Sequence, residues 1–508
     1  MPSVVALLAS LLFTAYLDVR ARKSCPLPSG AAWIAVIWIT IVGTRPVSDW
    51  FGGGLEPDTP KDYLQGSPID AYVYLALIAA TLFVLARRKG AATSIVASNP
   101  WFVVFLLYCL LSVTWSHYPF VAFKRWFKDL GNVAIVLLLL SERDPLVALR
   151  GVFLRYIYLA VPLSVVFIKY FPDIGRYMDR WTWEFHFSGV TSEKNALGLV
   201  AAVSTIFLVW DLLERRAAHR QRVATASLGR RLSHSKAKDE AVADAPSTKR
   251  ESPASSSTSA VETANGHTKL DWALDAILLL MSLWLLKQSD SSTAFACTVV
   301  GVAILLAPRY FSHLGLVALL VVVPAMLVYF ALGHTFADIL AQISEMLGRD
   351  ETLTGRTDLW EDLLDAPINH VIGTGYQSFW LGWQAAALWE KYYFHPNQAH
   401  NGYLETWLNG GVIGVCILGV MIVLTWRKLS KDLSTGTLYA CFRFSLFVLA
   451  VLSNWTEATF NRVSLTWILF IIASLDYRAW QVMKTSCATE ASPVRRKRRS
   501  SRERVALP

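Results

Sequence analysis

Long apolar blocks constrain this chain more than any other feature of its sequence. Blocks of about 15–22 apolar residues recur along it, each near the roughly 20 residues that a helix needs to cross a bilayer. Only helices and closed barrels satisfy their backbone hydrogen bonds in lipid, and continuous rather than alternating apolar runs favour helices. Hydrophobic residues make up 54% of the 508 residues, too many for an ordinary soluble protein of this length. The sequence therefore predicts an all-α integral membrane protein.

The apolar blocks give an expected number of crossings. Our best count is about 13 transmembrane helices, and about 12 to 14 would fit, because two blocks are short or carry charges. The blocks lie at about 3–17, 30–44, 70–86, 100–115, 125–140, 152–169, 196–213, 271–287, 292–307, 311–332, 410–426, 437–454 and 463–477.

Basic residues set the expected orientation, because cytoplasmic loops carry an excess of Lys and Arg. Basic runs follow the first and third blocks and occupy the tail from 495 to 499. They place the N-terminus outside and the C-terminus inside, in agreement with an odd number of crossings. The first block lacks a preceding basic region, so we expect an uncleaved helix. The net charge of +10 comes from these runs and does not indicate a nucleic-acid partner.

Two long polar regions differ in composition. Residues 214–270 are charged, rich in Ser and Ala and poor in large apolar residues, which is typical of disorder. Residues 333–409 carry many aromatic residues, a helical repeat at 359–365 and turn signals around Gly373. We expect an N-terminal bundle (1–213), a disordered cytoplasmic loop (214–270), helices at 271–332, a folded outer loop (333–409), C-terminal helices (410–477) and a basic cytoplasmic tail (478–508).

A polar segment containing histidine runs directly into an apolar helix at 395–414, HPNQAHNGYLETWLNGGVIG. A lone His at a helix entry is more often a capping residue. The polar neighbours of His400 favour chemistry instead, because a neutral imidazole can take a proton from a hydroxyl group. Glu405 is a candidate to orient it, and Asn401 and Tyr403 are candidate binding residues. The glycines from 410 to 414 let another backbone or a ligand approach closely.

Several cations lie on the predicted outer side, against the charge bias. The planar guanidinium group of Arg can donate paired hydrogen bonds to phosphate oxygens. For any one cation, an ion pair with a nearby carboxylate is the simpler explanation, but as a set they favour an anionic ligand. Glu457 is a candidate for the same site, although a solvated turn explains it as well. The cations are Arg45, Arg125, Arg176, Arg180, Lys194 and Arg356.

Cysteine spacing gives no sign of a metal site. The 6 Cys residues form no CxxC or Cys/His pattern. We predict no structural metal, no disulfide and no cofactor.

Several motifs resemble the O-antigen ligase/polymerase superfamily. The pattern HN-x9-G-x-x-G begins at His400, and GRTDLW (355–360) precedes the turn at Gly373 and Gly375. The N-terminal stretches WIAVIWITIVGTRPVSDWF (33–51), GSPID (66–70) and FSGVTSEKNALG (187–198) resemble the exopolysaccharide-production branch, whose members are polymerase-like.

The resemblance implies a membrane glycosyltransferase of the GT-C type in a bacterial inner membrane. Such an enzyme takes a glycan from undecaprenyl diphosphate and joins it to an acceptor sugar hydroxyl at the periplasmic face, without a required metal. By motif, His400 would be the general base and Arg356 a ligand of the diphosphate. The second cation would be Lys194, Arg180 or Arg176. A single displacement would invert the anomeric centre.

Other functions stay open at this point. Within the same chemistry, a ligase would use lipid A core or a protein as acceptor, and a chain-length regulator is an open partner of a polymerase. A flippase for lipid-linked glycans would carry cations along a path through several helices, whereas here they gather at the outer mouth. We favour the polymerase because the N-terminal stretches resemble the exopolysaccharide branch. A receptor or scaffold has no feature in its favour.

Overall fold

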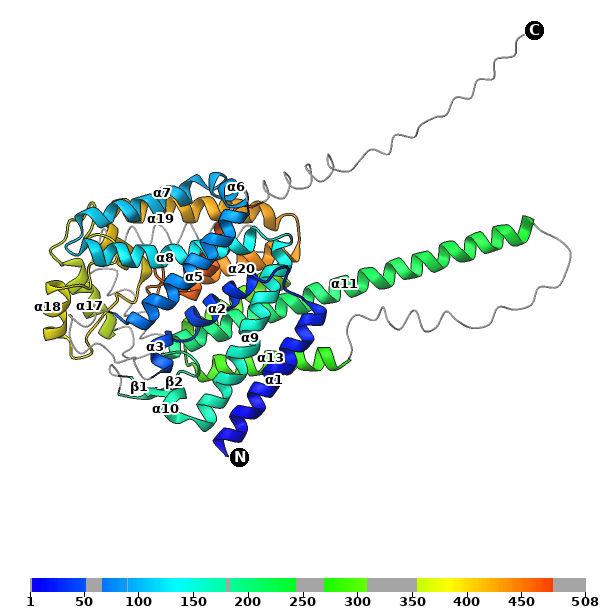
Figure 1. Cartoon of the computed structure of the whole chain (residues 1–508), viewed down its shortest axis with the longest axis horizontal. Coiled ribbons are helices and arrows are strands. Elements are labelled where there is room, and N and C mark those ends of the chain that lie inside the picture. Colours follow the sequence, from blue (N-terminus) through cyan, green and yellow to red (C-terminus); the bar gives the residue numbers. More distant parts are fainter. Residues whose placement is uncertain are drawn as a thin grey trace, which may run out of the picture.

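The computed structural model describes residues 2–51, 66–88, 90–179, 183–243, 269–307 and 354–477. Regular structure in these ranges is helical apart from one short antiparallel hairpin. The prediction of a mostly helical protein is thus confirmed where the chain is described. Figure 1 shows the helices packed into a bundle.

The helices follow the predicted apolar blocks. The first half contains α1 (Ser3–Ser24), α2 (Ala32–Val42), α3 (Val47–Trp50), α5 (Pro68–Arg87), α6 (Ala91–Ala97), α7 (Pro100–Leu111), η1 (Ser112–Trp115), α8 (Pro119–Leu140), α9 (Pro145–Tyr170), α10 (Pro172–Gly175), β1 (Arg176–Met178) and β2 (Phe185–Phe187). The second half contains α11 (Lys194–Ala243), α13 (Lys269–Gln288), α14 (Ser292–Leu306), α17 (Thr354–Leu364), α18 (Trp383–Lys391), α19 (Gly402–Leu433), α20 (Leu438–Ser453) and α21 (Leu465–Ser474). The predicted block 311–332 lies outside the described residues.

Local sequence explains where helices begin. Asp144 caps α9 by accepting a hydrogen bond from the N–H of Val147, and Ser464 caps α21 through the N–H of Trp467. Pro occupies the first turn of α5, α7, α8 and α9, where its missing N–H costs nothing. Short polar caps followed by apolar residues therefore define the helix starts.

Membrane-spanning character is concentrated in a few long helices. Among the described residues, 5 helices (α1, α5, α9, α11 and α19) are long and apolar enough to cross a membrane, or up to 6 if α6 and the segment Pro100–Trp115, bent by 91°, form one span. The chain is accordingly a multi-pass membrane protein. The larger number expected from the sequence also counts shorter apolar helices (α2, α14, α20 and α21) and helices that carry charges, such as α8.

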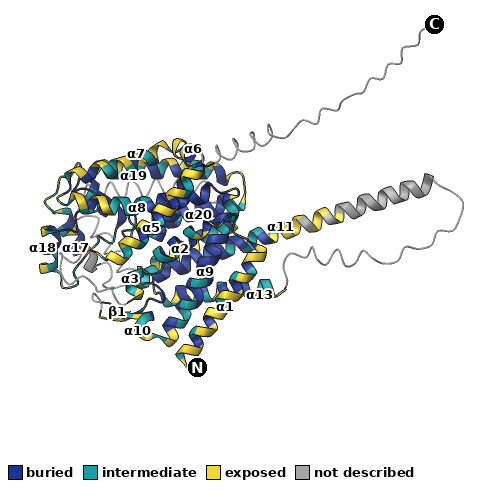
Figure 2. Ribbon diagram, viewed as in Figure 1, coloured by how far each residue is buried: buried dark blue, intermediate teal, exposed yellow. Residues whose placement is uncertain are grey.

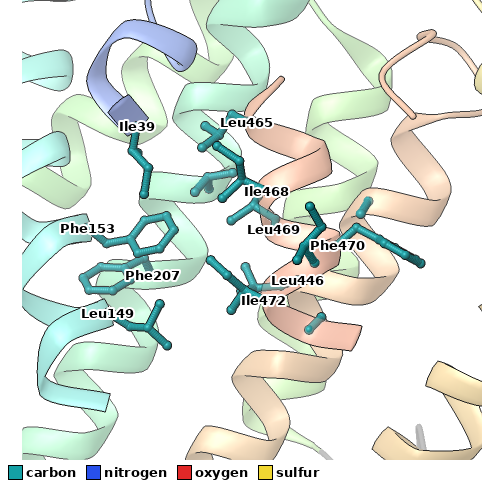
Figure 3. Packing of buried hydrophobic residues seen from close by; sticks show 14 of the residues in the cluster. Ile39, Leu149, Phe153, Phe207, Leu446, Leu465, Ile468, Leu469, Phe470 and Ile472 are labelled. Atoms are coloured by element: carbon teal, nitrogen blue, oxygen red, sulfur yellow. The ribbon is translucent and has the colours of Figure 1, made fainter. Parts of the chain in front are cut away.

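The core lies where α9, α11, α20 and α21 meet. Phe153 stacks on Phe207 with their ring centroids 5.6 Å apart, and every residue of α21 is buried. Figure 3 shows these rings beside the aliphatic side chains of α20 and α21. By contrast, α1 and α5 show broad exposed faces in Figure 2 that are rich in apolar residues, such as Leu12 (71% exposed) and Tyr72 (73%). Exposed apolar area of this extent suits contact with lipid.

Helix α11 is longer than expected, because the sequence predicted its end at residue 213. The structure continues it to Ala243, into the range 214–270 for which we predicted disorder. Ala and Arg are frequent in 214–243 and are strong helix formers, so the helix propagates from its buried part. Residues 244–268 lie outside the described residues.

The two ends of the bundle differ. In Figure 1, α10, α17, α18, β1 and β2 gather at one end, and α11 projects from the opposite end. Ion pairs fasten the helices near that projection: Arg215 pairs with Asp211 and, at 2.6 Å, with Asp275 of α13. We call the first end the loop end and define it by residues 172–179, 183–193, 365–401 and 454–464. The candidate site lies at the loop end.

Candidate functional site

A break in α19 creates the framework of the site. Gly411 has φ 60° and ψ −165°, a conformation open essentially to Gly alone. The N–H groups of Val412 and Ile413 donate to the carbonyls of His370 and Val371 at 2.9 and 3.2 Å. The break separates a polar segment (402–410) from the apolar helix that follows. The expected close approach of another backbone to these glycines is confirmed.

The described part of the outer loop is folded. Leu359 and Leu363 of α17 pack with Phe379, Trp380 and Trp407 in a small apolar cluster. The predicted helix at 359–365 and the predicted turn are confirmed, because α17 covers Thr354–Leu364 and Gly373 and Gly375 have φ of 68° and 97°. Residues 333–353 lie outside the described range.

Glu405 fastens four segments together. Its buried carboxylate accepts hydrogen bonds from the N–H of Ala399 (3.0 Å) and from Nε1 of Trp380 (2.9 Å). It also accepts from Nδ2 of Asn409 (3.1 Å) and pairs with Nη2 of Arg462 at 2.8 Å. A buried carboxylate is stable when donors and an opposite charge surround it in this way. The predicted role of Glu405 in orienting the His400 ring is therefore wrong, since Glu405 holds the backbone beside His400 instead.

Glu457 is the carboxylate that lies against His400. The two side chains are 20% and 15% exposed, and His400 Nδ1 lies 3.8 Å from Glu457 Oε2. The other oxygen of Glu457 accepts a hydrogen bond of 2.6 Å from Asn195. His400 has φ of 48°, which is uncommon for a residue other than Gly and is often found at functional sites. Three segments distant in sequence thus meet at one imidazole–carboxylate pair.

Lys194 is the first residue of α11 and directly precedes Asn195, which bonds to Glu457. Its Nζ lies 3.1 Å from Nε2 of His186, and its backbone N–H donates to the hydroxyl of Tyr177 at 3.2 Å. Burial, and then the charge of Lys194, lower the pKa of His186. A neutral His186 can accept a hydrogen bond from the ammonium group, so the hairpin positions Lys194.

A cavity of about 280 Å³ opens next to Glu457. Its lining combines polar residues (Glu193, Asn195 and Thr293) with apolar residues (Leu199 and Leu449). A cavity lined by both polar and apolar side chains suits an amphiphilic ligand.

Three of the predicted cations are used inside the protein. Arg45 donates to the carbonyls of Thr191 (2.7 Å) and Ile174 (2.5 Å), and burial lowers its pKa. Arg125 donates to the carbonyl of Gln377 at 2.7 Å. Arg176 donates to the carbonyl of Ile168 and lies over the ring of Phe187. These contacts with backbone oxygens are a role that we did not expect, since the alternative that we weighed was an ion pair.

The remaining predicted residues are placed as follows. Arg356 lies in the first turn of α17, and its side chain is outside the described part, as is Arg180 altogether. Asn401 caps α19 by accepting from the N–H groups of Tyr403 and Leu404, both at 3.0 Å. The buried Tyr403 donates to the carbonyl of Val451. Asn401 and Tyr403 therefore shape the helix entry.

Three residues of the site were missed from the sequence: Asn195, His186 and Arg462. Asn195 directly follows Lys194, and Arg462 shares a short loop with Glu457. Both could have been found, because each is close in sequence to a predicted site residue. His186 carried none, because its inward direction depends on the register of a three-residue strand. Within the described ranges, no group of three or more His, Cys, Asp or Glu residues is arranged to hold a metal ion.

The fold and the site define a multi-pass helical membrane protein with an imidazole–carboxylate pair beside an amphiphilic cavity. Residues 276–419, a stretch that includes His400 and Gly411, match the family model described as O-antigen ligase. The exopolysaccharide production protein ExoQ of Rhizobium meliloti (strain 1021) is 29% identical over 167 residues, which span 30% of this chain and 38% of that relative. The resemblance expected from the motifs is confirmed.

Proposed function

We propose that this protein polymerises oligosaccharide repeat units carried on undecaprenyl diphosphate, at the periplasmic face of a bacterial inner membrane. The product would be an exopolysaccharide or an O-antigen. The observation that carries the proposal is the contact of His400 with Glu457, a residue that lines a cavity with both polar and apolar side chains. The family match and the named relative support glycan chemistry of this kind.

His400 is the proposed general base. It takes the proton of an acceptor hydroxyl, and the hydroxyl oxygen attacks the anomeric carbon while the bond to the diphosphate breaks. One displacement of this kind inverts the anomeric centre, and no metal takes part. Glu457 holds the imidazole in place and stabilises it once it carries the proton, as a carboxylate beside a His does in hydrolytic triads. Asn195 fixes the carboxylate in turn.

In the proposed reaction, cations stabilise the leaving diphosphate. Lys194 is the first proposed ligand, because Asn195 follows it directly and bonds to Glu457. Arg356, on the loop that covers the site, is the second proposed ligand. Positive groups fixed where negative charge develops are a large source of catalysis. The apolar walls of the cavity hold the polyprenyl chain.

The test replaces His400 with Ala and Glu457 with Gln in the native host. Polysaccharides and lipid-linked glycans are then separated by size, and the membrane abundance of each variant is measured. We expect His400→Ala to lower polymer synthesis at least about a hundredfold, the usual contribution of a general base, with single lipid-linked repeats accumulating at the periplasmic face. Glu457→Gln should lower it by a smaller factor.

Other outcomes identify the alternatives. Long polymer that forms and is attached normally in His400→Ala, at normal protein abundance, would refute the proposed base. Accumulation of lipid-linked repeats facing the cytoplasm would indicate a flippase. Polymer that forms normally but is not attached to lipid A core or protein would indicate a ligase. A chain-length regulator, if one acts here, would alter the length of the polymer and not its existence.

A further inference from the structure

The β1–β2 hairpin has two different faces. Its strands pair with Tyr177 opposite His186 and Met178 opposite Phe185. Side chains alternate between the faces of a strand, so the first pair faces Lys194 and the second faces away. Phe185 and Met178 are 72% and 45% exposed. The outer face of the hairpin therefore offers apolar surface at the loop end.

A groove of about 530 Å³ lies against the hairpin and α10. Its lining combines the rings of Phe185 and Phe187 with the carboxylate of Asp173 and the guanidinium of Arg176. Arg176 lies 5.4 Å from the centroid of the Phe187 ring. Aromatic rings accept the C–H face of a sugar, and the charged groups accept or donate hydrogen bonds to its hydroxyls. A groove meant only for acyl chains would not need Asp173 and Arg176 in its lining.

Two exposed aromatic rings lie parallel at the end of the hairpin. Trp183 (65% exposed) and Tyr393 (59%) stack at an interplanar angle of 11°, with centroids 6.3 Å apart. Trp183 has φ of 56°, a conformation that bulky residues rarely adopt. Tyr393 comes from the loop that leads to His400. The pair thus joins the hairpin to the segment that carries the proposed base.

A chain of contacts connects the hairpin to the proposed reaction centre. His186 of β2 contacts Lys194, the next residue Asn195 bonds to Glu457 at 2.6 Å, and Glu457 lies 3.8 Å from His400. A ligand held on the hairpin would therefore lie on the same end of the bundle as His400.

We propose that the hairpin groove and the Trp183–Tyr393 pair bind a saccharide chain, namely the acceptor glycan. The proposal rests on the proposed function for the identity of that glycan. The competing occupant is the membrane interface, where exposed Trp and Phe are common. The polar lining of the groove and the parallel rings favour the saccharide.

The test measures binding directly. The probe is a set of end-labelled oligosaccharides released by mild acid from the polymer of the host. They are titrated against the full-length protein in detergent micelles, with His400→Ala as the background so that no turnover occurs. Trp183→Ala should bind about tenfold more weakly, which corresponds to roughly 1.4 kcal/mol. Trp183→Phe should bind nearly as well as the parent, and Trp183→Leu as poorly as Trp183→Ala. Trp101→Ala, at an exposed position on α7, is the matched control.

Three results would overturn the saccharide site: no binding by the parent protein, equal binding by all Trp183 variants, or binding by Trp183→Leu as tight as the parent. The last would mean that any apolar side chain suffices, as in a lipid contact. In cells that retain His400, Trp183→Ala should give shorter polymer. If His400→Ala alone left polymer synthesis intact, the proposed function would fail while the binding result stood by itself.

Discussion

At the scale of single residues, the geometry of the site depends on which carboxylate contacts the imidazole and which one pairs with a cation. Glu405 pairs with Arg462 and holds the backbone of Ala399, whereas Glu457 lies against His400. The two carboxylates are not interchangeable, because one stabilises the loop that carries His400 and the other lies against its ring.

The His186–Lys194 contact predicts a pH effect. Burial and Lys194 lower the pKa of His186, and the weaker effects of Asp179, Glu184 and Asp290 oppose the shift. Below about pH 6.5, the ordinary pKa of His, His186 binds a proton more readily in the unfolded chain than in the folded protein. Stability is therefore unaffected at higher pH and falls as the pH drops through that value.

The measurement is thermal unfolding in detergent between pH 5 and pH 7.5. His186→Gln, which keeps an acceptor but does not titrate, is the control. The wild type should lose more stability than His186→Gln as the pH falls below about 6.5. Parallel curves for the two proteins would show that His186 is not held neutral.

How far the sequence predicts the site depends on the residue. The position of His400 at a helix entry was predictable, because a polar motif runs into an apolar helix, and its role as a base stays a prediction. The role of Glu405 was not, because a separation of five residues on paper does not reveal that the helix begins between them and turns Glu405 toward Arg462. The contacts of Arg45 with backbone carbonyls were not predictable, because such contacts leave no trace in the sequence.

At the scale of elements, the break at Gly411 lets the loop at 369–375 pack into α19. A Cβ at Gly411 would overlap the backbone of Val371 and Ile372. Because the paired backbones fix the helix entry, the position of His400 depends on this break.

Gly411→Ala should destabilise the protein by at least about 1–3 kcal/mol, the cost of holding a residue other than Gly in this conformation. Gly419→Ala lies on the same helix in open space and should be neutral or stabilise by about 0.5–1 kcal/mol. Thermal unfolding of both variants is the measurement. Equal stability of the two would mean that α19 is not broken at Gly411.

Most element positions followed from apolar blocks, because a buried or lipid-facing helix needs a continuous apolar run. The exceptions have physical reasons. The hairpin was missed because strands of three residues carry no periodic signal. The end of α11 was placed too early because loss of apolar residues does not end a helix that good helix formers continue.

At the scale of the whole molecule, the structure separates the loop end from the end where α11 projects (Figure 1). With the basic loops inside, as proposed, the loop end would face the periplasm. This orientation is needed for a lipid-linked donor to meet an acceptor outside the cytoplasm.

Cysteine labelling tests that orientation. In a variant that lacks the 6 native Cys residues, Glu390→Cys on α18 should react with an impermeant maleimide in cells whose outer membrane is permeabilised. Ser434→Cys, in the turn after α19, should react only after lysis. Both positions are exposed, so access to the reagent alone decides the result. Labelling of Ser434→Cys in intact cells would reverse the proposed topology.

Turnover by the purified protein tests the proposed polymerase reaction itself, in lipid vesicles supplied with the host's undecaprenyl-diphosphate-linked repeat unit. The measurement is release of undecaprenyl diphosphate together with the length of the glycan formed, in the presence of a metal chelator. We expect the wild type to release the carrier and lengthen the glycan, and His400→Ala to do so at least about a hundredfold more slowly. Near-normal turnover by a stably folded His400→Ala would contradict it.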